Sequence, residues 1–356
     1  TYPMLADLEA LVKLESPSED LQACRDVIAL ANEIATRVLG KPAEIREVNG
    51  RPVFWWGSST PDVVVLAHLD TVWPKGSFQP LWQVEGNVAR GPGIFDMKAG
   101  FIQALYAMKG ITGNAALIAT TDEETGSATT KEFIKEISAK AKAVLVLEAT
   151  LNGKVKTARK GTAMYQVKIH GKASHAGLEP EKGINATTEI AHAVLAIAAM
   201  ENSEHGTTVV PTTLRAGNTT NTVPDLAVLD IDIRSYSMAD LQRVDAAIKA
   251  LKPVNAAARY EITGGFNRPP LETSSTMALY ERAEKVAQSL GMPPLGHASV
   301  GGASDGNFAA AAGAQVLDGL GAVGDGAHAA HESVDISTLE DRSKLLNALI
   351  KDLLND

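Results

Sequence analysis

Residues 63–70 read VVVLAHLD, in which five apolar residues run directly into His68, Leu69 and Asp70. A run that is apolar at every position is typical of a central strand of a parallel sheet, which helices cover on both faces. Because side chains alternate along a strand, His68 and Asp70 are expected on the same side of it. Ligands bind at the carboxyl ends of strands in open α/β sheets, so this pair marks a candidate site. An equally simple interpretation is a buried histidine that forms its hydrogen bond with a neighbouring aspartate.

Strand-like and helix-like stretches alternate along the chain around residues 63–70. The apolar runs at 62–67, 115–121 and 143–147 predict strands, and the amphipathic stretches at 97–109 and 129–137 predict helices. This order predicts an α/β fold with a mainly parallel sheet.

The pattern changes near residue 160. Strands are predicted at 164–169, 207–214, 226–233 and 258–262, and helices at 185–200 and 238–251. The order β-α-β-β-α-β is that of a ferredoxin-like α+β domain. After residue 269 the alternation of helices and strands returns, and it ends in a predicted helix at 339–354. We therefore expect a larger domain formed by residues 1–159 and 270–356, with a smaller domain inserted at 160–269.

The composition is that of a globular protein with room for two cores, because 45% of the 356 residues are hydrophobic and 21% are charged. The net charge of -9 and the lack of a Lys- or Arg-rich segment argue against a nucleic-acid partner. No apolar stretch is long enough to span a bilayer, and the first residues do not resemble a signal peptide. A cytoplasmic protein without a membrane partner is expected, although a removed leader would leave no trace.

Cys24 is the one cysteine of the chain. An intramolecular disulfide is therefore impossible, and any metal would be held by histidine, aspartate and glutamate side chains. Acidic residues do follow the predicted strands. Asp96 stands where the loop at 91–95 enters a helix. Taken alone, this aspartate is more simply explained as the N-cap of that helix.

Glu123 and Glu124 follow the predicted strand at 115–121. Adjacent acids repel each other unless cations compensate them, although a solvated acidic loop is an equally good interpretation of this pair alone. Two adjacent acids can have different roles, in which one binds a metal and the other transfers protons. Glu148 ends the apolar strand at 143–147, so three predicted parallel strands end in an acid or a histidine.

The segment 324–332 reads GDGAHAAHE and adds His328 and His331 near the C-terminus. One aspartate, two glutamates and two histidines in a chain with a single cysteine form a ligand set that suits zinc, and cobalt or manganese can substitute.

Taken in order, these motifs resemble those of the acetylornithine deacetylase, succinyl-diaminopimelate desuccinylase and glutamate carboxypeptidase family of di-zinc metallopeptidases. The resemblance rests on HLDTV at 68–72, GPGIFDMK at 91–98, TDEETG at 121–126, LE at 147–148 and GKASHAG at 171–177. It covers nearly the whole chain, and the segments 167–183 and 217–225 look most similar to bacterial glutamate carboxypeptidases. Ala149 departs from the family pattern, in which a proline commonly follows the acid.

The resemblance implies a centre with two zinc ions per chain. Five ligands follow from it: His68 and Glu148 for one zinc, Glu124 and His328 for the other, and Asp96 bridging both. Asp70 would orient His68, and Glu123 would be the general base when zinc-bound hydroxide attacks the amide carbon. His328 is preferred to His331 because the family's last ligand precedes a glutamate by four positions, and Glu332 satisfies that spacing only from His328.

The resemblance also implies residues outside the metal centre. His175 looks like the family residue that donates a hydrogen bond to the oxyanion, commonly from the partner subunit of a dimer. Without its motif, it would be interpreted as part of a polar turn. The substrate carboxylate calls for guanidinium or amide donors. The candidates are Arg268, which comes first by analogy with glutamate carboxypeptidases, and Asn221, Arg234 and the backbone of Gly302. An ion pair of Arg234 with Asp230 or Asp232 is an equally good alternative.

The sequence therefore predicts a hydrolase that cleaves an amide bond next to a free carboxylate in a small peptide or an N-acyl amino acid, similar to a glutamate carboxypeptidase. An N-acyl amino acid deacylase is the first alternative, because it shares every metal ligand. A non-catalytic metal-binding scaffold is the second, although a scaffold would need neither Glu123 nor Asp70.

The larger domain would be catalytic, and the inserted domain would serve as a lid and for dimerisation. A ferredoxin-like unit leaves a sheet edge exposed, and Ile190, Val194 and Ile197 have the spacing of a buried helix stripe. Two such units joined edge to edge would cover both features in a twofold homodimer.

Overall fold

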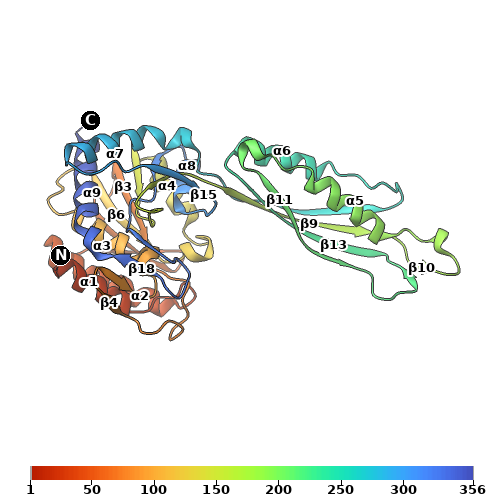
Figure 1. Cartoon of the computed structure of the whole chain (residues 1–356), viewed down its shortest axis with the longest axis horizontal. Coiled ribbons are helices and arrows are strands. Elements are labelled where there is room, and N and C mark those ends of the chain that lie inside the picture. The colour runs from red at the N-terminus through yellow and green to blue at the C-terminus, as the bar shows by residue number, and fades with distance from the viewer. Residues whose placement is uncertain (1, 356) are drawn as a thin grey trace. The chain divides into compact units, whose positions relative to one another are not determined.

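The computed structural model describes residues 2–355, which divide into two compact units (Figure 1). The first unit comprises Thr1–Ala158, Leu271–Val300 and Ser304–Asp356, and the second comprises Arg159–Pro270 and Gly301–Ala303. Within the described part of the chain, no helix combines the length and the apolar character that crossing a membrane requires. The roles of lid and dimerisation domain stay predictions for the second unit.

A six-stranded sheet forms the centre of the first unit. Its strands, in spatial order, are β1 (Glu44–Val48), β2 (Arg51–Gly57), β6 (Ala115–Thr120), β3 (Val63–His68), β7 (Ala143–Val146) and β16 (Gln315–Leu317). The last four run parallel to one another, whereas β1 and β2 form an antiparallel hairpin that pairs antiparallel with β6. The predicted α/β fold with a mainly parallel sheet is confirmed, and the antiparallel hairpin is an addition that the sequence patterns did not indicate.

Both faces of this sheet are covered, which explains why residues 63–67 of β3 are all apolar. Val63, Val65 and Ala67 belong to the core on one face, and Val64 and Leu66 belong to the core on the other. The first core is covered by α1 (Tyr2–Lys13), α2 (Leu21–Leu39), α3 (Ala99–Ala107), α7 (Met277–Ser289) and α9 (Leu339–Leu354), and the second by α4 (Lys131–Ala139) and α8 (Asp305–Ala311). In Figure 1, β3 and β6 lie between α3 and α9 on one side and α4 and α8 on the other.

A four-stranded antiparallel sheet brings distant parts of the chain together. Its strands, in spatial order, are β17 (Gly324–Asp325), β18 (Ser333–Asp335), β5 (Val88–Arg90) and β4 (Gln83–Glu85). Since β5 leads into residues 91–96 and β17 leads into residues 326–332, the sheet holds these two loops next to each other. In addition, β8 (Val155–Arg159) pairs with β15 (His297–Val300) in a separate two-stranded sheet.

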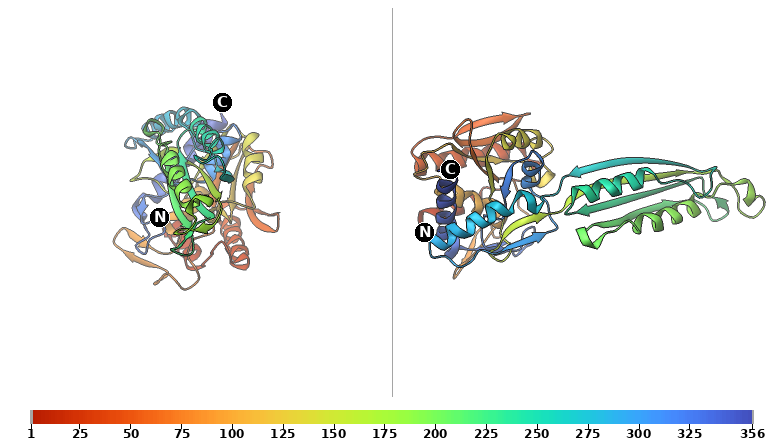
Figure 2. Two further views of the ribbon diagram at one scale, coloured as in Figure 1. Left: turned by 90° about the vertical axis from the view of Figure 1, so that its right-hand side faces the viewer. Right: turned by 90° about the horizontal axis from the view of Figure 1, so that it is seen from above.

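The second unit is an antiparallel sheet with two helices on one face. Its strands, in spatial order, are β11 (Thr208–Ala216), β13 (Leu226–Ser235), β9 (Gly161–His170) and β14 (Arg259–Arg268). The helices α5 (Ala186–Ala198) and α6 (Met238–Lys249) share one apolar core with this sheet (Figure 2). The chain order is β-α-β-β-α-β, so the ferredoxin-like prediction is confirmed. A short ribbon of β10 (Ser174–His175) and β12 (Thr222–Val223) belongs to the same unit.

The expectation that a dimer partner covers the apolar stripe of α5 is wrong. Ile190 and Ile197 are buried in the core that α5 forms with the sheet of its own unit, and Val194 packs against this core. The spacing does mark a buried stripe, but the same chain covers it. The strands β11 and β14 form the two edges of this sheet.

Candidate metal centre

Three parallel strands end at one edge of the central sheet, and each end carries an acid or a histidine. His68 is the last residue of β3, whereas Glu123 and Glu124 follow β6 in the short turn η2 (Glu123–Thr125). Glu148 comes just after the end of β7. Because β3 lies between β6 and β7 in the sheet, strand pairing alone brings these side chains together.

Two further groups come from the loops that the small sheet holds next to each other. Asp96 lies in η1 (Ile94–Lys98), an irregular turn that leads into α3. His328 lies between β17 and β18, and its φ of 64° falls in the left-handed region. Few residues other than glycine adopt this conformation, so the structure around His328 must impose it.

Asp96 presents one carboxylate oxygen to each of two imidazoles. Its Oδ1 lies 3.1 Å from Nε2 of His68, and its Oδ2 lies 3.1 Å from Nε2 of His328. Each imidazole also faces a second carboxylate. Oε1 of Glu148 is 3.3 Å from Nε2 of His68, and Oε2 of Glu124 is 3.1 Å from Nε2 of His328. The centre therefore consists of two groups of polar side chains that share Asp96.

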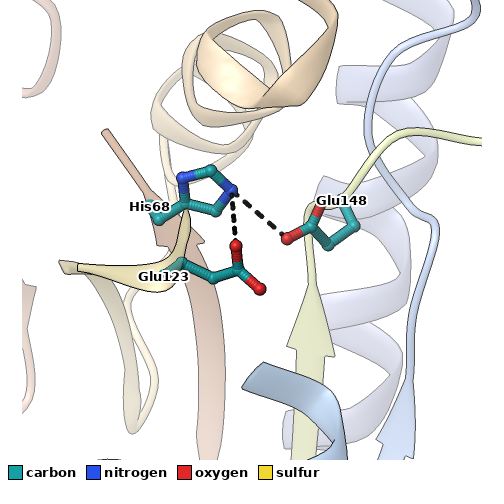
Figure 3. Close-up of side chains that lie close together, drawn as sticks. All are labelled: His68, Glu123 and Glu148. Atoms are coloured by element: carbon teal, nitrogen blue, oxygen red, sulfur yellow. Dashed lines mark ion pairs between the residues drawn. The ribbon is translucent and has the colours of Figure 1, made fainter. Parts of the chain in front are cut away.

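Glu123 and Glu148 both point toward Nε2 of His68 (Figure 3), and Oε2 of Glu123 is 3.8 Å from it. Potential ligand atoms of His68, Glu123 and Glu148 lie within 4.8 Å of one another, and so do those of His68, Asp96 and Glu124. Proximity alone therefore does not separate Glu123 from the metal-ligand candidates. The shorter distance to His68 favours Glu148 as the ligand beside that histidine.

An unsatisfied carboxylate oxygen points to a bound cation. Oε1 of Glu124 is buried and has no hydrogen-bond partner among the residues that the structure describes. A buried charged oxygen without a partner is costly, and coordination to a cation removes that cost. Carboxylates and imidazoles without thiolates suit zinc and similar divalent ions. The residues present fit a metal centre.

Buried negative charge dominates the electrostatics of the centre. Burial raises the pKa of the Glu123 carboxyl well above its usual range, and the nearby charge of Glu148 raises it further. Burial and the charge of Asp96 raise the pKa of Glu124 to about 7. Hydrogen bonds to Asp96 and Glu124 raise the pKa of His328 to about 10. Burial and the crowding of carboxylates thus act together, and protons or metal cations must compensate the negative charge.

Asp70 connects His68 to the neighbouring segments. Its buried carboxylate has Oδ1 3.3 Å from Nδ1 of His68. Oδ2 accepts hydrogen bonds from Oγ of Ser18 at 2.6 Å and from the backbone N–H of Glu124 at 3.1 Å. Burial alone would raise the pKa of Asp70, but the hydrogen bonds from His68 and Ser18 hold it below its usual range. With Nδ1 of His68 engaged, Nε2 is the nitrogen that faces the metal-ligand candidates. No sequence pattern indicated Ser18.

Glu332 holds the loop that carries Asp96. Its buried carboxylate accepts the backbone N–H groups of Gly93 at 3.1 Å, Phe95 at 3.1 Å and Asp96 at 3.0 Å, and the indole N–H of Trp73 at 2.8 Å. Burial raises the pKa of this carboxyl, while these donors oppose the shift. The spacing of four positions between His328 and Glu332 is the sequence signal that could have indicated this contact with the loop.

The structure distinguishes the two histidines of the C-terminal loop. His328 reaches Asp96 and Glu124 while 53% of its side chain is exposed. His331 is 68% exposed, and its Nε2 lies 3.4 Å from Oδ2 of Asp325. The geometry favours His328 as the metal-ligand candidate.

His175 belongs to the second unit, where it lies in β10 with its side chain exposed. Its Nδ1 accepts the backbone N–H groups of Gly177 and Leu178, each at 3.1 Å. In the neutral ring the proton is therefore on Nε2, so that Nε2–H is available as a hydrogen-bond donor.

The four candidates for binding the substrate carboxylate also belong to the second unit: Arg268, Asn221, Arg234 and Gly302. Arg268 is a largely buried residue at the end of β14. Nε of Arg234 lies 2.9 Å from Oδ1 of Asp232, which is the ion pair that the sequence offered as an alternative. The backbone carbonyls of Asn221 and Gly302 each accept a hydrogen bond within the same unit. The metal-ligand candidates all belong to the first unit.

Known proteins are similar to this chain in sequence and in fold. Residues 64–352 match the family described as Peptidase family M20/M25/M40. The chain belongs to this family. This M20/M25/M40 peptidase is 33% identical over 316 residues to Carboxypeptidase G2 from Pseudomonas sp. (strain RS-16), a match that covers 83% of this chain and 75% of that protein.

The M20/M25/M40 peptidase also resembles two further enzymes. It is 28% identical over 320 residues to a succinyl-diaminopimelate desuccinylase from Sulfurovum sp. (strain NBC37-1), covering 83% of this chain and 84% of that enzyme. Its fold matches the crystal structure of aminopeptidase PepT from Bacillus cereus ATCC 10987 with a TM-score of 0.78 over 98% of each chain, at 22% identity. The family predicted from the motifs is confirmed, and so is the prediction of an enzyme of the metallopeptidase type.

Proposed function

We propose that this peptidase is a di-zinc hydrolase that cleaves an amide bond next to a free carboxylate, in a small peptide or an N-acyl amino acid. The placement of Asp96 carries the proposal, because its two carboxylate oxygens face His68 and His328 separately. A carboxylate that presents one oxygen to each of two ligand groups can hold a pair of cations close together.

The metal ligands in this proposal are His68 and Glu148 on one side, Glu124 and His328 on the other, and Asp96 between them. When bound, zinc would lower the pKa of a coordinated water toward neutrality and would polarise the carbonyl group of the substrate. Cobalt and manganese are compatible with the same ligand types. Asp70 keeps Nδ1 of His68 engaged and thereby orients its Nε2.

Glu123 acts as the general base. Its Oε2 lies 3.8 Å from Nε2 of His68, farther than the nearest oxygens of Asp96 at 3.1 Å and Glu148 at 3.3 Å. We therefore place Glu123 outside the ligand set, where it takes a proton from the attacking water and returns it to the leaving amine.

The second unit supplies the remaining contacts with the substrate. His175 donates its Nε2–H to the oxyanion, a role that its engaged Nδ1 supports. Arg268 is the first candidate for binding the free carboxylate of the substrate, followed by Asn221, Arg234 and Gly302. In a homodimer, His175 of one subunit would complete the site of its partner.

An N-acyl amino acid deacylase is the second candidate function, and the desuccinylase relative favours it at 28% identity over 83% of this chain. Both reactions use the same metal ligands and the same base. They differ in the acyl group that is removed, so the choice between them depends on the part of the site that receives this group.

The purified protein is expected to contain about two zinc ions per chain, as a shared carboxylate between two ligand groups requires. Mass spectrometry of metal content measures the ratio, and a panel of N-acyl and peptidyl glutamates, aspartates and ornithines measures activity. Chelation should abolish hydrolysis, and added zinc should restore it. Full activity of a metal-free preparation, or no turnover of any amide in the panel with zinc present, would contradict the proposed function.

Glu332→Gln is expected to weaken metal binding by about 10–100-fold, the usual effect of losing a group that orients a ligand. Glu332 now accepts hydrogen bonds from three backbone N–H groups. The amide N–H groups of a glutamine would face these donors without bonding to them, and this would loosen the loop around Asp96. Zinc titration against a competing chelator measures the affinity. Glu33→Gln on the exposed side of α2 is the matched control. Unchanged zinc affinity in Glu332→Gln would show that the loop holds Asp96 without this carboxylate.

A further inference from the structure

The turn that carries the proposed base is followed by a residue in an unfavourable backbone conformation. In the described part of the chain, a φ in the left-handed region occurs at four residues other than glycine, which are Asn49, Ser127, Asn152 and His328. Asparagine tolerates this region better than most residues, and His328 is a metal-ligand candidate. Ser127 has a φ of 54° and is fully buried, shortly after Glu123 in the sequence. Strain of this kind often persists where function requires it, so Ser127 calls for an explanation.

Ser127 joins the turn to two helices through its polar groups. Its backbone N–H donates to the carbonyl of Asp122 at 2.9 Å, and its carbonyl accepts the N–H of Lys131, the first residue of α4, at 2.8 Å. Its Oγ donates to Oδ1 of Asp305, the first residue of α8. Both Ser127 and Asp305 are buried, so water does not compete for this hydrogen bond. The bond therefore fixes the turn after β6 to the start of α8.

The start of α8 is itself held in place, and with it Asp305. The N–H of Ser304 donates to the side chain of Asn307 at 3.0 Å, which is half of a capping box. Oγ of Ser304 donates to Oδ2 of Asp318 at 2.5 Å, and Asp318 directly follows β16 of the central sheet. The carboxylate that accepts the Ser127 hydroxyl is thus anchored to the sheet.

Asp70 holds the other side of the turn. Its Oδ1 accepts the backbone N–H of Glu123 at 3.3 Å, and its Oδ2 accepts that of Glu124 at 3.1 Å. In the loaded enzyme coordination would also fix the side chain of Glu124, whereas Glu123 lies outside the proposed ligand set. The conformation of the turn then determines where the carboxylate of Glu123 stands relative to the metal centre. A displacement of about 1 Å at a reacting group can cost roughly 10²-fold in rate.

We propose that Ser127 and Asp305 are positioning residues for the general base. The hydrogen bond between them holds the turn in the conformation that directs the carboxylate of Glu123 toward Nε2 of His68 (Figure 3). This role rests on the proposed amide hydrolysis with Glu123 as base. It explains why a serine occupies a left-handed position, because a glycine would relieve the strain but would lack the hydroxyl.

Ser127→Gly and Ser127→Ala test the proposal as a pair, because both remove the hydroxyl and only alanine keeps a Cβ in the left-handed region. Both are expected to lower kcat by roughly 10–100-fold, with KM changed by less than about threefold and with unchanged zinc content. Their melting temperatures should differ, with the glycine variant about 2–4 °C above the alanine variant. Equal losses of kcat at unequal stability identify positioning by the hydroxyl. A wild-type kcat in Ser127→Gly would overturn the proposal.

Ser138→Ala is the matched control. Its hydroxyl is buried in α4 and has no hydrogen-bond partner among the residues that the structure describes, so kcat should stay within about twofold of wild type.

Substitutions of Asp305 test the other end of the hydrogen bond. Asp305→Ala should lower kcat at least as much as the Ser127 variants do. In that background Ser127→Gly should lower kcat by less than about twofold further, because both changes remove the same bond. Asp305→Asn keeps an oxygen acceptor for the hydroxyl and should recover most of the activity that Asp305→Ala loses. Independent, multiplicative effects of the two substitutions would contradict the proposal.

Hydrogen exchange separates failure of this proposal from failure of the proposed hydrolysis. Mass spectrometry of the purified proteins follows the backbone N–H groups of residues 122–126. Their exchange is expected to be at least about tenfold faster in both Ser127 variants than in wild type and Ser138→Ala, because the turn opens more often without the bond to Asp305. If the wild type hydrolyses no amide, the proposed function fails, and the exchange rates still decide about the turn. Equal exchange in all four proteins would overturn the positioning role.

Discussion

Glu123→Gln is expected to keep its metals and to lower kcat by roughly 10²–10⁴-fold, the usual contribution of a general base. The glutamine side chain fills nearly the same space but does not accept a proton from water. The Glu123 carboxylate is farther from Nε2 of His68 than those of Asp96 and Glu148 are, so its replacement should leave the ligand set intact. Metal analysis and steady-state kinetics on the same preparation measure both effects.

Glu124→Ala is the matched comparison, because both residues lie in the same turn after β6. This variant should lose affinity for one of the two metals, since Oε2 of Glu124 faces His328 at 3.1 Å. Equal metal loss in both variants would show that Glu123 is a ligand and that the base lies elsewhere. A ligand role for Glu123 is the specific alternative to its role as base, because the potential ligand atoms of His68, Glu123 and Glu148 lie close together.

His175→Ala is expected to lower kcat by about 10²–10³-fold, as removal of an oxyanion donor does. Zinc content should not change, because His175 belongs to the second unit and the metal-ligand candidates belong to the first. Kinetics and metal analysis measure the two quantities. His192→Ala, on the exposed side of α5 in the same unit, is the control and should keep normal activity.

Mixing His175→Ala chains with Glu123→Gln chains tests whether the donor crosses between subunits. If the enzyme forms a homodimer, each variant alone would retain little activity, whereas a mixed dimer would contain one site with both an intact base and an intact donor. Activity should then return to a measurable fraction of wild type. A purified mixed dimer that stays inactive would place His175 in the site of its own subunit or outside the chemistry, and a monomeric active enzyme would exclude a shared site.

Local patterns in the sequence predicted the main elements because each element is determined by its own residues. The strands β3 and β6 are apolar up to their last residues, His68 and Thr120, and β7 is apolar throughout, because both faces of the sheet are buried. The helix α9 was predicted with its observed bounds, Leu339–Leu354, from its amphipathic spacing. The metal-ligand candidates at strand ends follow from the same logic, since strands that pair in parallel bring their ends together.

Features that depend on pairing between distant segments were not predictable in this way. The antiparallel hairpin of β1 and β2 and the small sheet of β17, β18, β5 and β4 join short segments without a strong pattern. The contact of Glu332 with Gly93, Phe95 and Asp96 depends on that small sheet. The α5 stripe was assigned to the wrong partner, because helical spacing shows that a face is buried but not what buries it.

The small sheet also has a consequence for how the enzyme matures during synthesis. Its strands β5 and β18 are separated by the whole of the second unit in the sequence, yet they hold Asp96 and His328 together. A nascent chain can form β3, β6 and β7 early, but it cannot bring His328 to Asp96 until the ribosome has released residues 324–335. Closing so long a loop makes the contact of His328 with Asp96 and Glu124 a late product of folding. Interrupted translation would therefore yield a chain that has β3, β6 and β7 but lacks His328 beside Asp96.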